Sequence, residues 1–325
     1  MDETAKEKSN KCLTRQQLDF FKELKTKYNF QGFIHTTSFE NFIKIMKCGY
    51  IYSRKYINNN QVCHNDIALK DVIETTEEEI KEYVRFYWRV KTPTNYDNEG
   101  IKPKSALIDN YEAHSPNPVI LVFKNEIILN NNVKFTPINA RSIHSKLYEN
   151  CQNNYIFKWD YIFHNTPIYQ EEDKTSIIRS RNAEILYPKL ISTDFIYRII
   201  FRSKADYDRA NFYLGNDKRF CIDCTQFFEN WLYLKDYKIK TSPQYINIQF
   251  QYSFGNEFKT RYNCNLGEYS HEIAFFDKNN NCIYRLNINE LIVKNPTIEI
   301  INNYNYKILC YYIDKIECIR TKIND

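Results

Sequence analysis

The apolar positions near the N-terminus predict an amphipathic helix followed by a strand. Thr14-Arg15-Gln16-Gln17 has the form of a capping box, which starts a helix at this point. We expect the helix over 14–28, a strand over 30–37 and an unstructured lead over 1–12. The apolar residues at helical spacing are Leu18, Phe21, Leu24 and Tyr28.

The pattern then alternates between short helices and short strands. Ser38 stands where a helix N-cap belongs and Gly49 where a C-terminal glycine belongs, so a helix is expected between them. Residues 54–81 are polar and predict mainly a loop. Further helices are expected near 67–80, 140–150 and 204–213, and strands at 50–53, 83–90, 119–124, 133–136, 182–187, 195–202 and 220–222.

After about residue 234 the sequence pattern changes to short segments of alternating polar and apolar residues, rich in Ile, Tyr and Phe. This pattern is typical of an all-β sandwich or barrel. We place a boundary at the Lys-rich stretch 236–243. The chain then divides into an N-terminal lead and helix (1–29), an α+β domain (30–236) and an all-β domain (237–325). The expected strands of the last are 244–252, 257–264, 269–277, 282–293, 297–301, 306–313 and 316–320.

Composition excludes several classes of protein. The six glycines are too far apart for a GxGxxG or a GxxxxGK[ST] motif, so a Rossmann fingerprint and a Walker loop are both absent. No apolar run is long enough for a membrane span, and the charged N-terminus lacks a signal core, so we expect a cytoplasmic protein with reduced cysteines. The net charge of +5 is compatible with nucleic-acid binding but does not establish it.

One candidate for chemistry is the corner where the strand at 30–37 meets the next helix. His35 and Thr37 lie on the same face of a strand, and Asn41 falls in the first turn of the helix. Such a corner suits the hydroxyls of a ribose or an amide. Taken alone, however, the residues favour a core histidine and a helix cap.

A second candidate is Glu184, which stands among Ala, Ile and Leu in a predicted strand. If this carboxylate faces a partly apolar cleft, its pKa rises and it can act as a base or stabilise positive charge. If it faces solvent beside Arg181, it is a surface pair. No metal is expected, because the Cys221–Cys224 pair has no partner pair at zinc-site spacing.

Taken in order, these segments resemble an ADP-ribosyltransferase domain of the DarT family, toxins that attach ADP-ribose to thymidine bases of single-stranded DNA. The opening His-x-Thr-x-x-x-Asn, with the later Gly-x-Ile-x-Ser, is similar to the start of that domain. The stretches Tyr83-Val84-Arg85-Phe86-Tyr87-Trp88, Phe135-Thr136-Pro137, Trp159-Asp160 and Arg181-Asn182-Ala183-Glu184-Ile185-Leu186 follow in the family's order. The resemblance covers roughly residues 30–233.

The resemblance implies split antiparallel sheets with flanking helices that hold NAD as co-substrate without a metal. It implies Glu184 as the catalytic carboxylate, which stabilises an oxocarbenium ion at the ribose and accepts a proton. The remaining expectations are Arg85 in catalysis, His35, Thr37, Asn41, Tyr52 and Arg54 in NAD binding, and Tyr87 and Arg181 in nucleic-acid binding.

Two positions depart from the family pattern. The arginine that the family carries between the first motif and the Tyr-Val strand would fall near Thr76, in an acidic segment. Another basic residue, such as Arg54, Lys55 or Arg85, would then replace it. Arg85 itself stands where the family has proline, and it is expected either beside the cleft or on a surface strand.

The resemblance implies a toxin of a toxin–antitoxin or phage-defence system, with a macrodomain ADP-ribosyl hydrolase as its expected antitoxin. Single-stranded DNA is the expected acceptor. Two alternatives stay open on the sequence: the same fold acting on RNA or protein, and a catalytically degenerate binding module. The role of the all-β domain is not predicted.

Overall fold

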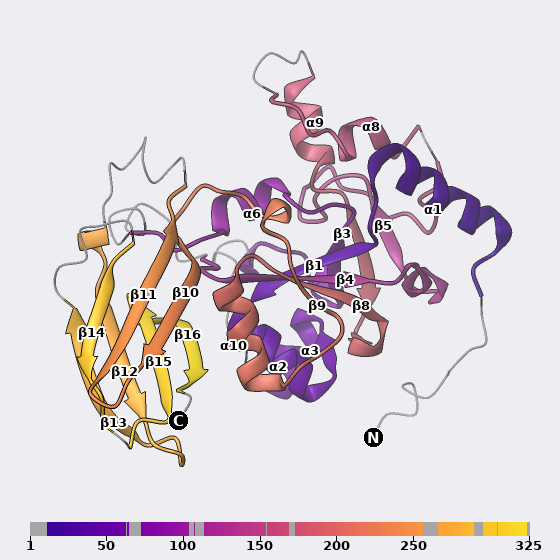
Figure 1. The fold of residues 1–325 in the computed structure, drawn as a ribbon. Coiled ribbons are helices and arrows are strands. Elements are labelled where there is room, and N and C mark those ends of the chain that lie inside the picture. The colour runs from indigo at the N-terminus through magenta and orange to yellow at the C-terminus, as the bar shows by residue number, and fades with distance from the viewer. Residues whose placement is uncertain are drawn as a thin grey trace.

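The computed structural model describes residues 12–62, 64, 73–103, 107, 114–153, 155–168, 173–255, 266–288, 295–303 and 305–323. Figure 1 shows a mixed part of helices and strands beside a part built of strands. Helix α10 (Lys204–Leu214) lies where the two parts meet, in contact with α2 on one side and with β16 on the other. The fold is therefore α+β with a β extension, as expected.

A seven-stranded sheet forms the centre of the mixed part, in the order β5-β6-β3-β1-β4-β8-β9. Its neighbours are antiparallel except for β8 and β9. Every residue of β4 is buried, which explains its uninterrupted apolar run. The strands are β1 (Phe33–Ser38), β3 (Tyr83–Tyr87), β4 (Pro118–Phe123), β5 (Lys134–Thr136), β6 (Glu184–Pro188), β8 (Ile196–Phe201) and β9 (Phe220–Ile222).

This sheet opens between β1 and β3. Strand β1 pairs with β4 over its whole length, and β3 pairs with β6 over its whole length. In contrast, β1 and β3 share a single pair in register, Ile34↔Tyr87. The expected split therefore lies within one sheet, as a gap between two adjacent strands.

The two helices predicted near the N-terminus are present, and their caps are the predicted residues. Helix α1 (Arg15–Tyr28) begins with the capping box of Thr14 and Gln17. Helix α2 (Phe39–Cys48) begins at Ser38, whose side chain accepts from the Asn41 N–H, and ends at Gly49 with φ 81°. That left-handed backbone suits a residue without Cβ.

The remaining elements of the mixed part are short. Strands β2 (Tyr50–Tyr52) and β7 (Leu190–Ser192) form a separate two-stranded sheet. The helices are α3 (Arg54–Asn60), α5 (Glu78–Lys81), α6 (Pro93–Asn98), α8 (Trp159–Ile162) and α9 (Lys174–Ser180), and the 3-10 turns are η2 (Asn125–Leu129), η3 (Thr193–Phe195) and η4 (Cys224–Gln226). Among the described helices, none has the length and apolarity to cross a bilayer.

Two predicted elements are wrong. The helix expected over 140–150 is absent: Phe135 and Tyr148 form a β-bridge, and the Asn139 side chain accepts from the Arg141 N–H in a turn. Residues 54–60, expected as loop, form α3, which Ser53 caps. The strand expected over 257–264 and most of the helix expected near 67–80 lie outside the described residues.

The β part consists of two antiparallel sheets, β10-β11-β14 and β13-β12-β15-β16. Both sheets contribute to one core, which includes Ile248, Phe250, Phe275 and Leu309, as in the predicted sandwich. Residues 236–241 of the Lys-rich stretch at which we placed the boundary are part of β10. The elements are β10 (Tyr233–Thr241), β11 (Tyr245–Ser253), η5 (Leu266–Glu268), β12 (His271–Phe276), β13 (Cys282–Ile288), β14 (Thr297–Ile301), β15 (Ile308–Ile313) and β16 (Ile316–Lys322).

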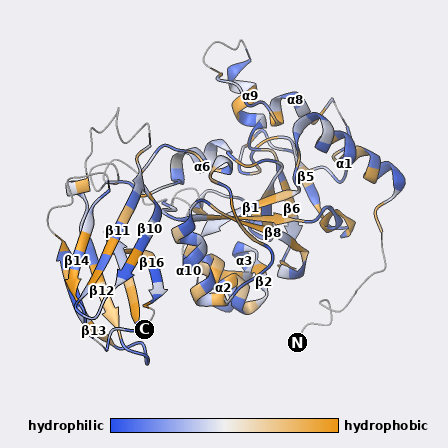
Figure 2. Cartoon of the chain, viewed as in Figure 1, coloured by the Kyte–Doolittle hydropathy of each residue, from blue (hydrophilic) through white to orange (hydrophobic). Residues whose placement is uncertain are grey.

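The two parts are packed firmly together through α10. The Tyr213 hydroxyl donates to Glu317 Oε1 at 2.8 Å, and the Arg320 guanidinium lies 5.4 Å from the Phe212 ring. Phe212 also packs against a small apolar cluster that includes Phe276 of the β part. Figure 2 shows apolar residues along the central strands of the main sheet and mixed hydropathy on α10.

We predict that Phe212→Ala lowers the free energy of unfolding by about 2 kcal/mol, because it removes half-buried apolar contact between the parts. Urea unfolding measures the change. Leu18→Ala is the control: this side chain is 53% exposed, so its effect should stay below about 0.5 kcal/mol. Equal effects from the two variants would contradict the interface described here.

Candidate active site

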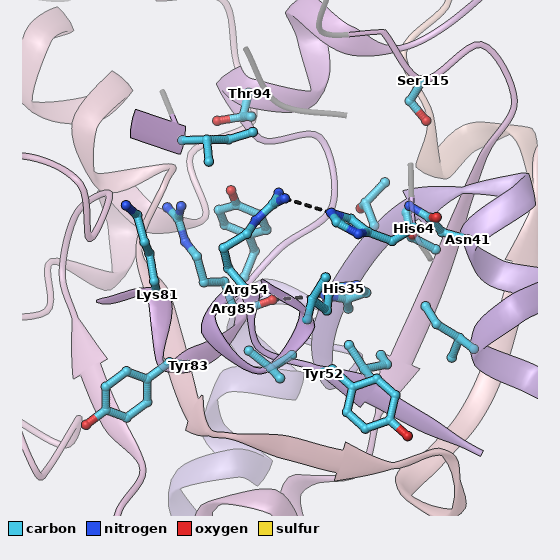
Figure 3. Close-up of a pocket in the computed structure, with 18 of the residues that line it drawn as sticks. His35, Asn41, Tyr52, Arg54, His64, Lys81, Tyr83, Arg85, Thr94 and Ser115 are labelled. Carbon is cyan, nitrogen blue, oxygen red and sulfur yellow. Dashed lines mark hydrogen bonds between the residues drawn. The ribbon is translucent and has the colours of Figure 1, made fainter. Parts of the chain in front are cut away.

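A cleft of about 440 Å³ lies at the opening between β1 and β3. Its walls come from β1, α2, β2, α3, β3 and α6, together with the loop after β5. Figure 3 shows side chains from these elements converging on it. Beyond Ile34↔Tyr87, β1 and β3 do not pair, and polar side chains line the space between them.

His35 bridges the two walls of the cleft. Its Nδ1 donates to the Arg85 carbonyl oxygen at 3.0 Å, in place of the ladder bonds that β1 and β3 lack. Burial lowers the pKa of His35, although the bond to Arg85 opposes this effect, so the ring is neutral at pH 7. A neutral ring that donates through Nδ1 keeps Nε2 as an acceptor.

Glu184 lies beneath the cleft and is completely buried. Arg85 holds it with two hydrogen bonds, from Nε to Oε2 at 2.7 Å and from Nη2 to Oε1 at 2.5 Å. Arg85 also donates to Asn139 Oδ1 and lines the cleft with a side chain that is 29% exposed. The guanidinium therefore stands between the carboxylate and the cleft.

Burial and the neighbouring charges shift the pKa values of Arg85 and of Tyr87, which lies beside it. Burial acts to lower the pKa of Arg85, but the charge of Glu184, its hydrogen bond and the nearby Tyr87 together outweigh burial, and the net pKa is raised. Burial, helped by the Glu184 charge, also raises the pKa of Tyr87 to about 12. At pH 7 Arg85 is a cation and Tyr87 is a neutral phenol.

Cations outnumber carboxylates in the cleft. Its described lining contains five Lys and Arg residues and one carboxylate, that of Glu99. Two of the cations are paired with carboxylates outside the lining, Lys81 with Glu78 and Arg85 with Glu184. Glu99 is buried and lies 3.4 Å from Arg202; burial raises its pKa to about 7 against the opposing charge of Arg202. The cleft therefore suits an anionic ligand. The five cations are Lys44, Arg54, Lys81, Arg85 and Arg141.

Most of the residues expected at the site meet in this cleft. The exceptions are Glu184, which Arg85 covers, and Arg181, which lines a different cavity and donates to His164 Nδ1 and to the Thr166 carbonyl oxygen. Arg181 therefore does not form the surface pair with Glu184 that was one alternative. The residues in the cleft are His35, Thr37, Asn41, Tyr52, Arg54, Arg85 and Tyr87.

Several polar residues that the sequence did not single out also line the cleft. His64 accepts a hydrogen bond from Arg54 at 2.7 Å (Figure 3). Asn139 contacts Arg85, and Arg141 donates to Thr75 Oγ1, beside the position where the family arginine was expected. Ser115 is buried, and its hydroxyl has no hydrogen-bond partner. No sequence signal marks Ser115 or Asn139.

The described residues contain no group of three or more metal-ligating side chains. The fold and the cleft instead define an α+β protein that offers a cationic site, with a buried carboxylate beneath it, at a split in an antiparallel sheet. The sequence model described as DarT, ssDNA thymidine ADP-ribosyltransferase, matches residues 34–231. The chain therefore belongs to the DarT family, which confirms the resemblance seen in the sequence.

Solved structures of the family are similar to this chain at low identity. Thermosipho africanus DarTG in complex with ADP-ribose is 17% identical with a TM-score of 0.50, over 61% of this chain and 51% of that one. Thermus sp. 2.9 DarT in complex with ADP-ribosylated ssDNA is 16% identical with a TM-score of 0.49, over 60% and 95%. The same Thermus protein in complex with NAD+ is 15% identical with a TM-score of 0.47, over 60% of this chain and 96% of that one. No curated protein matches the chain.

We predict that His35→Ala weakens NAD binding about tenfold, since it removes both the bridge to Arg85 and the Nε2 acceptor. Titration calorimetry with NAD measures the affinity. His144→Ala is the control, because His144 is exposed and does not line the cleft. Unchanged affinity in His35→Ala would remove this residue from the binding site.

Proposed function

We propose that this protein transfers ADP-ribose from NAD to thymidine bases of single-stranded DNA. The observation that carries the proposal is the Arg85–Glu184 pair beneath a cationic cleft, in a chain of the DarT family. The family description supplies the acceptor, and the cleft supplies a place for the donor. Thermus sp. 2.9 DarT has been solved with NAD+ and with ADP-ribosylated ssDNA.

The side chains present fit NAD. Its pyrophosphate is an anion, and the cleft offers Arg54 and Arg141 without a free carboxylate among its described residues. The unpartnered Ser115 hydroxyl and the Nε2 acceptor of His35 are suited to ribose hydroxyls. Thr37, Asn41 and Tyr52 complete the set that we assign to NAD.

In the proposed reaction the bond between ribose and nicotinamide breaks, and its electron pair leaves with nicotinamide. A bond from the ribose to the base forms, and the base gives up a proton. Positive charge develops on the ribose during this exchange, and a fixed carboxylate stabilises it. Glu184 is the carboxylate that we assign to this role and to accepting the proton.

Arg85 must move, or act together with Glu184, for that carboxylate to reach the ribose, because Arg85 now separates it from the cleft. We assign Arg85 a catalytic role as the partner that holds Glu184 charged and oriented. Its position also favours a second candidate function. A guanidinium that permanently covers the carboxylate would leave a binding module without transfer activity.

The proposed function carries two expectations about the cell. A chain that modifies DNA bases is toxic to its own host, so we assign it to a toxin–antitoxin or phage-defence system. We propose a macrodomain ADP-ribosyl hydrolase as the antitoxin partner. The related DarTG structure from Thermosipho africanus contains ADP-ribose.

We predict that Glu184→Gln lowers transfer by about a hundredfold or more while the fold is kept. Glutamine retains the size of the side chain and an acceptor for Arg85, whereas alanine would leave a buried cavity beside an unpaired cation. The measurement is transfer of adenine-labelled NAD to single-stranded DNA, duplex DNA, RNA and protein in separate reactions.

The acceptor panel distinguishes the candidates. Label on single-stranded DNA that disappears in Glu184→Gln supports the proposal, and label on RNA or protein would replace the acceptor. If Glu184→Gln transfers at the parent rate, the catalytic assignment is wrong. NAD binding with no label on any acceptor would favour the binding module.

We predict that Arg85→Lys lowers the transfer rate more than tenfold with little change in NAD affinity. Lysine keeps the positive charge but cannot make the two parallel hydrogen bonds to Glu184. Steady-state kinetics separates the two effects. Lys81→Arg, in the same cleft but without contact to Glu184, is the matched control. A faster rate in Arg85→Lys would mean that Arg85 blocks the site.

A further inference from the structure

A second cavity, of about 810 Å³, lies on the other side of α6. Thr94 and Asn95 of this helix line the cleft, whereas Pro93 and Tyr96 line the second cavity. A hydrogen bond also connects the two linings: the Thr94 hydroxyl donates to Oδ1 of Asn182, which directly follows Arg181 of the second cavity. A ligand that crosses α6 can therefore occupy both sites.

The described lining of this cavity is cationic and aromatic. It contains Arg89, Lys91 and Arg181 but no Asp or Glu. Its aromatic residues are Tyr28, Phe30, Trp88, Tyr96, Phe163 and Phe228. Cations beside aromatic rings, without carboxylates, are the combination that binds single-stranded nucleic acid: the cations contact phosphates and the bases stack on the rings.

Among the described residues, neither of the two arginines has a carboxylate partner. Arg89 donates to the carbonyl oxygens of Val90, Ile162 and His164, and Arg181 donates to His164 and to the Thr166 carbonyl oxygen. None of these acceptors is an anion. Burial, with the nearby charge of Arg181, lowers the pKa of Arg89 to about 10. An anion in the cavity would relieve this repulsion.

Two buried donors in the lining also have no partner. The indole Nε1–H of Trp88 is unpaired although the residue is 1% exposed, and the Nε–H of Arg181 is unpaired as well. A buried donor without an acceptor is unfavourable. Both atoms are inaccessible to solvent, so a ligand oxygen would reach them only if the lining moved.

The rim of the cavity carries a stacking surface. Tyr96 is 42% exposed and packs edge-on against Phe228, with ring centroids 5.1 Å apart. The Lys91 ammonium lies 5.8 Å from the Phe228 ring centroid. Lys91 adopts φ 55°, a left-handed conformation that is uncommon for residues other than glycine and that occurs at ligand-binding loops.

From these observations we infer that the second cavity binds the nucleotides next to the thymidine that enters the cleft. The acceptor strand crosses α6, its phosphates contact Lys91 and Arg181, and a flanking base stacks on Tyr96 and Phe228. This inference rests on the proposed function, and it extends the acceptor from a single base to a segment of single-stranded DNA. Arg181 thereby receives a definite place in nucleic-acid binding.

The test compares two ligands: thymidine 5′-monophosphate, which the cleft alone can hold, and an oligothymidylate of about ten nucleotides. Titration calorimetry measures their binding to the full chain. Tyr96→Ala should weaken binding of the long strand about tenfold and leave binding of the monophosphate unchanged. Lys91→Gln should reduce the dependence of log K on log salt for the long strand by about 0.7.

Matched controls lie in the β part. Tyr245 is 41% exposed, close to the value for Tyr96, and Lys240 is an exposed lysine of β10, so Tyr245→Ala and Lys240→Gln should change neither quantity. Thermal melting confirms that each variant is folded.

The outcomes separate this inference from the proposed function. If the parent binds the long strand and both Tyr96→Ala and Lys91→Gln leave affinity and salt dependence unchanged, the second cavity is not the site, and the proposed function stands. Equal losses for the monophosphate and the long strand would also overturn it, because the effect would then belong to the cleft. A parent chain that binds NAD but neither of these ligands would overturn both proposals. Tighter binding of oligouridylate would replace DNA with RNA in this site.

Discussion

The ion pair between Glu184 and Arg85 is the constraint around which the site is arranged. A carboxylate buried without a partner is strongly unfavourable, so Glu184 can occupy a fully buried position at the start of β6 only because a cation meets it there. The register of β3 against β6 sets Tyr87 opposite Glu184 and Arg85 opposite Leu186. Arg85 is thus the diagonal neighbour of Glu184 on the same face, within reach of a long side chain. A shift of one residue would turn it to the other face.

The same residue connects both walls of the cleft. The Arg85 side chain binds Glu184 of β6, while its carbonyl oxygen accepts from His35 of β1. Strands β1 and β3 can therefore separate after Ile34↔Tyr87 without leaving the whole gap unbridged. Arg85 therefore connects His35, in the proposed NAD site, to the Glu184 carboxylate. A substitution at His35 should consequently shift the position of Arg85 and Glu184, and a substitution at Glu184 should shift His35.

Local signals in the sequence predicted local structure well, and long-range pairing poorly. The capping box at Thr14 and the Ser38 and Gly49 caps fix helix ends by contacts between near neighbours, and they are found as expected. The sequence also identified Arg85 as a departure, but not its partner, which lies 99 residues away and depends on the strand order β6-β3. We placed a domain boundary at the Lys-rich stretch 236–243, but its first residues belong to β10, in which lysines alternate with Tyr237 and Ile239 as in a half-exposed strand.

The placement of the β part limits how it can influence the site. None of the described residues that line the cleft or the second cavity belongs to β10–β16. The β part instead contacts the rest through α10 and through the bridge between Ile101 and Leu232. Ile101 lies shortly after α6, the helix that divides the two cavities, and its carbonyl oxygen accepts from Tyr269 of the β part. The described contacts offer two routes by which the β part could influence the site. One runs through Ile101 to α6, and the other runs through α10 to α2, which lines the cleft.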